Sequence, residues 1–218
     1  MSRVPSPDLA PEARSAGRLG ILGGSFDPPH RCHLEIARRA REAFALDHVL
    51  FVPARVPPHK LDRQLADDRD RVHMLELLLE PEPTERMSVW TGELLRDGPS
   101  YSVDTLLELN QHTTADLFWI LGSDNLPGLP KWSRVEEFLA LARPIVHYRV
   151  GDDLQLESMG SLSDAARQRL REGYLELEPC PASSTLVRSA IGLGRPIDDW
   201  VPPTLIQYIR AKGLYARS

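Results

Sequence analysis

Short apolar runs alternate with segments of helical periodicity along most of this chain, and no other sequence feature constrains the fold as strongly. The apolar runs cover residues 18–24, 48–53, 87–91, 116–121 and 144–150, with a half-exposed run at 174–178. Helical spacing occupies 33–46, 69–80, 102–109, 137–142, 163–172, 184–191 and 204–212. Buried strands that alternate with helices are typical of a parallel sheet. We therefore expect an α/β fold with a doubly wound, mostly parallel, Rossmann-like sheet, helices on both faces, and a small C-terminal helical part over 184–218.

Composition narrows the functional classes. The chain has 218 residues, with 26 Lys and Arg against 31 Asp and Glu, and a formal net charge of −5. An acidic balance disfavours a nucleic-acid-binding protein, which normally carries a basic stripe. No apolar run approaches the roughly 18 residues that a membrane span needs. Two cysteines, Cys32 and Cys180, suit a reducing compartment and predict no disulfide framework.

The N-terminal segment gives a prediction about location. Residues 1–17 contain several prolines and lack the continuous apolar stretch of a secretory signal. We expect a disordered tail over 1–17, a single domain over 18–218, and a cytoplasmic protein.

Polar motifs follow four of the expected strands, at residues 23–33, 53–60, 93–105 and 122–132. In open parallel sheets, ligands bind outside the carboxyl ends of the strands, where the strand order reverses. The first motif, GGSFDPPHRCH, has two glycines that permit close backbone approach and then enters a helix N-terminus that favours anions. His30 and His33 lie three residues apart there and are suited to donating to a phosphate. The alternative is a Gly-Pro turn with two surface imidazoles; a zinc site is poorly supported because no third ligand is nearby.

Five blocks in order resemble one family. They are GGSFDPPHRCHL, VPARVPPHK at 52–60, ELLRDGPSYSVDT at 93–105, WILGSDNL at 119–126 with LPKW at 129–132, and SSTLVR at 183–188. Together they are similar to the nucleotidyltransferase superfamily that carries H-x-G-H, in its bacterial nicotinate mononucleotide adenylyltransferase form. The resemblance covers about residues 19–215.

The resemblance implies adenylyl transfer from ATP to nicotinate mononucleotide, with pyrophosphate as the leaving group and Mg²⁺ carried by the ATP phosphates. It implies no metal held by the protein itself and no enzyme nucleophile. It assigns the reacting phosphates to His30 and His33, and the pyrophosphate to Arg188. The residues implied in ATP binding are Gly23, Gly24, Ser25, Phe26, Gly122, Asp124, Ser183, Ser184 and Thr185.

The residues implied in binding the mononucleotide each have an alternative interpretation. His59 and Lys60 suit its phosphate, or belong to a solvated Pro-rich loop. Tyr101 and Ser102 open a helix whose N–H groups suit a carboxylate, or Ser102 is simply an N-cap. Trp132 stacks on the pyridine ring or packs in the core, and Arg149 contacts substrate or solvent.

The chain departs from the family at one notable position. Cys32 replaces the glycine of H-x-G-H, and a cysteine would strain the backbone if that position needs a positive φ. A thiol between two histidines would also be acidic and oxidant-sensitive. Cys32 leaves open a non-catalytic nucleotide-binding protein of the same fold. A phosphopantetheine adenylyltransferase, which shares the first motif, is the other alternative, and the oligomeric state stays open.

Overall fold

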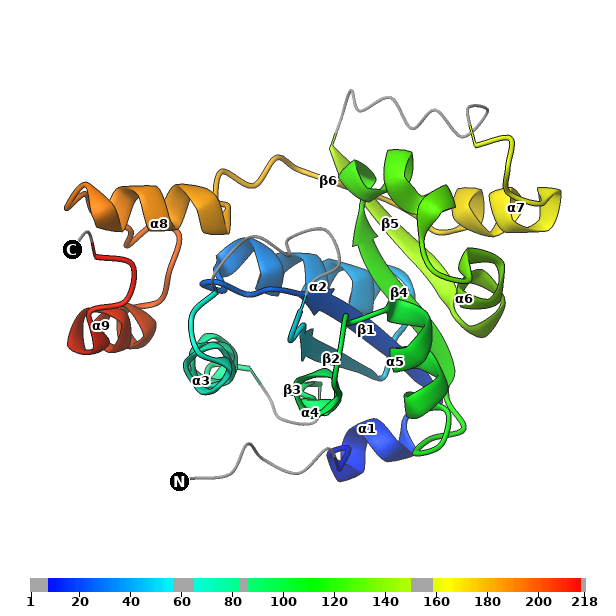
Figure 1. Ribbon diagram of the computed structural model, residues 1–218, viewed down its shortest axis with the longest axis horizontal. Coiled ribbons are helices and arrows are strands. Elements are labelled where there is room, and N and C mark those ends of the chain that lie inside the picture. The colour runs from blue at the N-terminus through cyan, green and yellow to red at the C-terminus, as the bar shows by residue number, and fades with distance from the viewer. Residues whose placement is uncertain (1–7, 57–64, 83–85, 150–158, 217–218) are drawn as a thin grey trace.

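The sheet runs through the centre of the molecule (Figure 1). The computed structural model describes residues 8–56, 65–82, 86–149 and 159–216. Within these ranges the sheet has six strands, all parallel, in the order β3-β2-β1-β4-β5-β6. They are β1 (Arg18–Gly24), β2 (His48–Pro53), β3 (Met87–Val89), β4 (Asp116–Gly122), β5 (Arg143–Arg149) and β6 (Tyr174–Leu177). Chain order reverses between β1 and β4, which is where a doubly wound sheet binds its ligand.

Helices cover both faces of the sheet, as the sequence predicts. The helices are α1 (Pro11–Ser15), α2 (Arg31–Ala43), α3 (Asp68–Leu79), α4 (Gly92–Leu95), α5 (Ser102–Leu109), α6 (Val135–Leu141), α7 (Asp164–Glu172), α8 (Ser184–Gly192) and α9 (Pro203–Lys212), with the 3₁₀ helix η1 (Ser123–Lys131). One core cluster joins the sheet to α1, α5, α6 and α7, and the other joins it to α2, α3, α8 and α9. The helices α8 and α9 lie together at one end of the molecule (Figure 1).

Successive side chains along each strand point to opposite faces of the sheet, and this alternation explains the two core clusters. In β4, Leu117, Trp119 and Leu121 point into the first cluster, while Phe118 and Ile120 point into the second. Because successive side chains of a strand face opposite sides, a continuous apolar run is buried on both. The doubly wound architecture is therefore confirmed, and β6 pairs with β5 in parallel register.

The N-terminal tail was predicted incorrectly for the residues that the structure describes. Residues 11–15 form α1, and Leu9 and Ala13 are buried in the first core cluster. A proline in the first turn and one small apolar face are sufficient to dock this short helix. Residues 1–7 lie outside the described ranges, and the single domain over 18–218 stays a prediction.

Residues 133–136 have the sequence pattern of a capping box, with Ser133 three residues before Glu136, but α6 does not begin with one. Arg134 occupies the N-cap in a left-handed conformation, with φ 49°, and no side chain caps the helix there. Glu136 instead accepts hydrogen bonds from the N–H and the hydroxyl of Ser163, both at 2.8 Å. Ser163, which is remote in the sequence, therefore binds the carboxylate that a capping box would have used.

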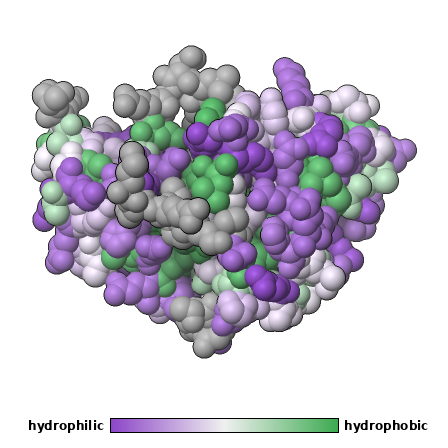
Figure 2. Space-filling view, turned by 60° about the horizontal axis from the view of Figure 1, so that its bottom comes forward, coloured by the Kyte–Doolittle hydropathy of each residue, from purple (hydrophilic) through white to green (hydrophobic). Residues whose placement is uncertain are grey.

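No helix in the described ranges is long and apolar enough to cross a membrane. Hydrophobic residues on the face shown in Figure 2 form separate patches between hydrophilic ones.

Candidate active site

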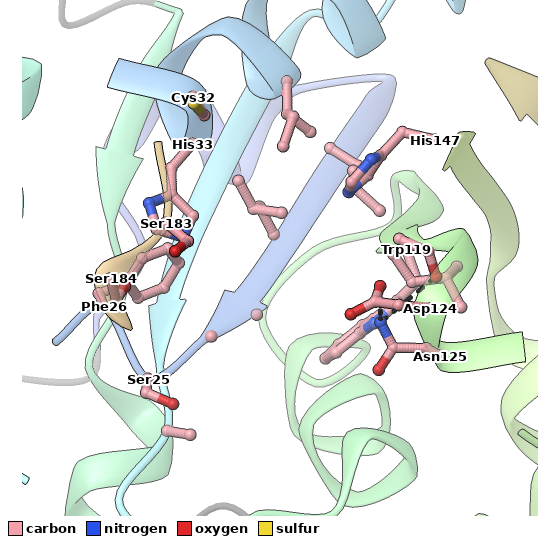
Figure 3. A pocket seen from close by; sticks show the side chains of 18 of the residues that line it. Ser25, Phe26, Cys32, His33, Trp119, Asp124, Asn125, His147, Ser183 and Ser184 are labelled. Carbon is pink, nitrogen blue, oxygen red and sulfur yellow. Dashed lines mark hydrogen bonds between the residues drawn. The ribbon is translucent and has the colours of Figure 1, made fainter. Parts of the chain in front are cut away.

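A cavity of about 700 Å³ opens at the carboxyl ends of β1 and β4. Figure 3 shows two groups of side chains around it: Ser25, Phe26, Cys32, His33, Ser183 and Ser184 on one side, and Trp119, Asp124, Asn125 and His147 on the other. The predicted site residues that line it are Gly23, Gly24, Ser25, Phe26, His30, His33, Tyr101, Ser102, Gly122, Asp124, Trp132, Ser183, Ser184, Thr185 and Arg188. The cavity therefore lies at the predicted reversal point of the sheet.

The structure does not describe the side chains of three predicted site residues, His59, Lys60 and Arg149. His59 and Lys60 lie outside the described ranges. Arg149 is the last residue of β5, opposite Leu177 of β6, and its side chain is also outside the description. Their expected contacts with the mononucleotide stay predictions.

His30 and His33 come together at the N-terminus of α2. The His30 N–H donates to His33 Nδ1 at 3.2 Å, and the two ring centroids are 3.8 Å apart. His30 is 5% exposed, and its Nδ1 has no hydrogen-bond partner among the described residues. Burial lowers the pKa of His30 from 6.5 to about 4, so its imidazole is neutral at pH 7. A buried polar atom of this kind is available for a hydrogen bond to a bound molecule or to water.

The loop before α2 is held by buried polar contacts. Arg71 is fully buried and donates to the Ser25 carbonyl oxygen at 2.8 Å and the Ala66 carbonyl oxygen at 3.2 Å. Phe26 adopts φ 47°, an unusual conformation for a bulky residue, and is 1% exposed. Its ring meets the His33 ring edge-on at a centroid distance of 5.0 Å. Packing of Phe26 thus supports the strained loop and the orientation of the imidazole.

The N-terminus of α8 reaches the same place from more than 150 residues later in the chain. Ser183 caps α8 by accepting from the Leu186 N–H at 3.2 Å. Ser184 Oγ donates to the Pro28 carbonyl oxygen at 2.9 Å, and Arg188 donates to the Asp27 carbonyl oxygen. Arg188 also donates to Thr185 Oγ1 at 3.0 Å. Two helix N-termini, each with a positive end, therefore flank one cavity.

The two cysteines contradict the prediction that the chain has no disulfide. Cys32 and Cys180 are joined by a disulfide across 148 residues, with their Cα atoms 5.8 Å apart. The acidic free thiol expected between the histidines is therefore absent at Cys32. The expected strain is absent as well, because Cys32 is the second residue of α2 and has no positive φ. Cysteine spacing could not reveal this pair, since only the tertiary fold brings the two residues together.

The second side of the cavity is built around Gly122 at the end of β4. A Cβ atom at Gly122 would lie 2.3 Å from Asp124 Oδ1 and 3.1 Å from His147 Cε1. The missing side chain therefore allows the carboxylate and the imidazole to approach the end of the strand. Asp124 also accepts from Asn125 Nδ2 at 3.1 Å.

Sequence reasoning missed several cavity residues. His147, Trp119 and Asn125 line the cavity, and Glu93 lies buried at its edge. Burial raises the pKa of the Glu93 carboxyl group, and the Thr105 hydroxyl donates to it at 2.5 Å. His147 pairs in register with Gly122 on the neighbouring strand, so its position could have been found from the strand alignment.

The structure bears on the alternative interpretations of Ser102 and Trp132. The helix α5 begins at Ser102 and its N-cap is Tyr101, so Ser102 is not the N-cap. The N-cap makes no side-chain hydrogen bond to the helix. Trp132 contacts the ring of Phe138 at a centroid distance of 5.3 Å and also lines the cavity. Packing in the core and contact with a ligand are thus compatible for Trp132.

No group of three or more His, Cys, Asp or Glu side chains in the described ranges is arranged to hold a metal ion. A divalent cation in this cavity would therefore have to take most of its ligands from substrate and water.

A doubly wound sheet with two helix N-termini at its reversal point, and with a histidine Nδ1 there that has no partner among the described residues, is typical of a nucleotide-binding α/β protein. The model of the cytidylyltransferase-like family matches residues 21–190. A Bacillus pumilus protein named "probable nicotinate-nucleotide adenylyltransferase" is 35% identical over 91% of this chain and 98% of its own. Relatives of the same name from Roseiflexus and Gloeobacter violaceus are 37% and 38% identical over 92% and 91% of this chain, and 99% and 96% of their own.

Solved structures support the fold. The Plasmodium falciparum nicotinic acid mononucleotide adenylyltransferase complexed with NaAD has a TM-score of 0.67 at 18% identity, over 91% of this chain and 97% of its own. The same enzyme complexed with APC has a TM-score of 0.66 over the same shares of the two chains, at 17% identity. With its sequence relatives, the chain belongs to the nicotinate-nucleotide adenylyltransferases of the cytidylyltransferase-like family.

Proposed function

We propose that this protein transfers the adenylyl group of ATP to nicotinate mononucleotide, forming nicotinate adenine dinucleotide and pyrophosphate in NAD biosynthesis. The names of its relatives support the reaction. The observation that carries the proposal is the buried His30 Nδ1, which lies between two helix N-termini and has no hydrogen-bond partner in the part of the chain that the structure describes. Two positive helix ends, together with imidazole, hydroxyl and guanidinium donors in one cavity, are suited to polyphosphate.

The reaction needs positioning and charge stabilisation rather than a protein nucleophile. A phosphate oxygen of the mononucleotide attacks the α-phosphorus of ATP, and the bond from that phosphorus to the β-phosphate oxygen breaks. His30 and His33 are proposed to hold the reacting phosphates, and Arg188 the pyrophosphate. Ser183, Ser184 and Thr185 would add donors from the first turn of α8. Fixed donors aimed at developing charge supply much of the acceleration in such reactions.

Binding of phosphate changes the protonation expected at His30. The pKa of about 4 applies to the protein without ligand, in which burial penalises the cation. A neighbouring polyanion favours the protonated imidazole and raises that pKa. We expect ATP binding to be accompanied by proton uptake at neutral pH.

The remaining predicted residues are proposed to bind the two nucleosides. Gly23, Gly24, Ser25 and Phe26 would lie along ATP, and Asp124 beside Gly122 would accept from a ribose hydroxyl. Backbone N–H groups of Tyr101 and Ser102 at the start of α5 would receive the nicotinate carboxylate, with Trp132 against its ring. The proposed ligands of the mononucleotide phosphate are His59, Lys60 and Arg149.

Mg²⁺ is proposed to enter with ATP. It would neutralise phosphate charge during transfer, held by phosphate oxygens and water. A cytoplasmic location and the absence of nucleic-acid binding stay predictions from the sequence.

The test is pyrophosphate release from ATP and Mg²⁺, with nicotinate mononucleotide, nicotinamide mononucleotide and phosphopantetheine offered in parallel. Release that is fastest with the nicotinate compound is the expected result. Release with phosphopantetheine alone would replace the acceptor, and no release with any acceptor would favour a non-catalytic nucleotide-binding protein.

A further inference from the structure

The disulfide between Cys32 and Cys180 lies inside the candidate active site. Cys32 is adjacent to His33 in the first turn of α2, and Cys180 precedes Ser183 by three residues. Both cysteines line the cavity, and Cys32 is 3% exposed. The bond therefore joins the two segments that carry the proposed phosphate ligands.

The segment between β6 and α8 has few buried side chains to hold it in place. Ala182 is buried, but Glu178, Pro179 and Pro181 are exposed, and β6 has already ended at Leu177. Cys32 Sγ lies 3.5 Å from the Ala182 carbonyl oxygen, so the disulfide fixes this segment close to its buried residue. The covalent bond thus acts at the place where packing is sparse.

Beyond the disulfide, the start of α8 contacts the first motif through the polar side chains of Ser184 and Arg188, and the Arg188 guanidinium also lies 3.9 Å from Asp27 Oδ2. Ser184 donates to the Pro28 carbonyl oxygen and Arg188 donates to the Asp27 carbonyl oxygen. Single hydrogen bonds at partly exposed positions exchange with water and are individually weak. The disulfide is the covalent one of these three links, and it does not exchange with solvent.

We propose that the Cys32–Cys180 disulfide is a positioning link of the adenylyl-transfer site, so that the transfer rate depends on the oxidation state of this pair. It holds the N-terminus of α8, with Ser183 and Arg188, against the histidines of α2. The inference rests on the proposed function. It also explains why a cysteine is compatible with the position where the resembling family has glycine, since the side chain is used in a bond.

The link can be opened by a dithiol reductant. One reductant thiolate attacks a protein sulfur, the second closes the reductant into a cyclic disulfide, and the two protein sulfurs receive the electron pair and two protons. The protein then holds two thiols, and only the buried Ala182 and non-covalent contacts of α8 keep the segment in place. A displacement of about 1 Å at a site of this kind costs up to about 10²-fold in rate.

The experiment compares the oxidised protein, the dithiol-reduced protein and the Cys32→Ala/Cys180→Ala double variant. Mass spectrometry under non-reducing conditions counts the thiols. We expect kcat/KM for ATP to fall about tenfold or more on reduction, mostly through kcat, and Tm to fall by roughly 5–15 °C. The double variant is the matched control: its rate should equal that of the reduced protein and should not respond to dithiol.

A purely structural bond would give a different result. If reduction lowered Tm but left kcat and KM unchanged at 25 °C, the positioning role would be wrong while the proposed function stood. Two free thiols in the air-oxidised protein would also overturn the proposal. If no form released pyrophosphate, the affinity of each form for a non-hydrolysable ATP analogue would test the positioning role without the reaction. We expect weaker binding after reduction, and equal affinities would reject the positioning role.

Discussion

Two helix N-termini meet at the cavity, and they are held there in different ways. The helix α2 follows β1 after six residues, and its position is set by that short loop and by buried Arg71 beneath it. The helix α8 begins at Ser184. The disulfide of Cys180 and the hydrogen bonds of Ser184 and Arg188 join it to residues 27–32.

The difference shows how one site can combine local and remote parts. Chain connectivity limits how far the α2 histidines can move, because the sheet and the helix at either end of the loop are both packed. The N-terminus of α8 has no short connection to the sheet. It is held by the core packing of Val187 and Ala190 and by side-chain contacts with residues 27–32. Substitutions of the α2 histidines should therefore remove groups that contact the reacting phosphates. Substitutions on the α8 side should lower the rate by changing the position of α8 relative to those histidines.

The largest effect is expected for His33→Ala. Removing a preorganised donor to the reacting phosphate should lower kcat by about 10²–10³. Steady-state pyrophosphate release measures it, and His73→Ala, an exposed histidine paired with Glu76 on α3, is the matched control. An unchanged kcat in His33→Ala would remove the phosphate role from the α2 side.

The next effect is the pH dependence of stability caused by His30. Its pKa is about 4 in the folded protein and 6.5 when unfolded, so the unfolded state binds the proton first as the pH falls. The stability it contributes is complete above pH 6.5 and is lost as the pH falls toward 4. Between pH 7 and pH 5 the wild type should lose about 2 kcal/mol more than His30→Asn.

Denaturant unfolding at both pH values measures this difference. Equal losses in the wild type and in His30→Asn would mean that His30 titrates normally and is not the buried neutral group on the α2 side.

The smallest effect concerns Tyr215, which supports Arg188 indirectly. The Tyr215 hydroxyl donates to Asp27 Oδ1 at 2.7 Å, and the carbonyl of the same Asp27 accepts from Arg188. Tyr215→Phe should lower kcat/KM for ATP about three- to tenfold, the usual effect of about 1 kcal/mol from one lost hydrogen bond.

The matched control for Tyr215 is Tyr208→Phe. Tyr208 also donates to an aspartate, Asp70 Oδ1 at 2.6 Å, but between α9 and α3 and outside the cavity lining. We expect both variants to lose similar stability and only Tyr215→Phe to lose activity. Similar kinetics in the two variants would show that the contact with Asp27 does not position Arg188.

Local sequence determined the sheet and much of the cavity. Apolar runs at 18–24 and 48–53 coincide with β1 and β2, because strands buried on both faces must be continuously apolar. The motifs after the strands meet at one edge because parallel strands bring their carboxyl ends together. His30 and His33 were predicted from such a motif and Asp124 and Arg188 from the family resemblance, and all four line the cavity.

Only the tertiary structure decided which partners these residues have. Glu136 bonds to Ser163 instead of its own helix, α1 packs on the core, and Cys32 pairs with Cys180 across 148 residues. Such contacts join segments that are remote in the sequence, and their free energy depends on distances that no local pattern specifies. The sequence thus established the sheet and the chemical groups at its edge, and the packing of distant segments decided how those groups are held.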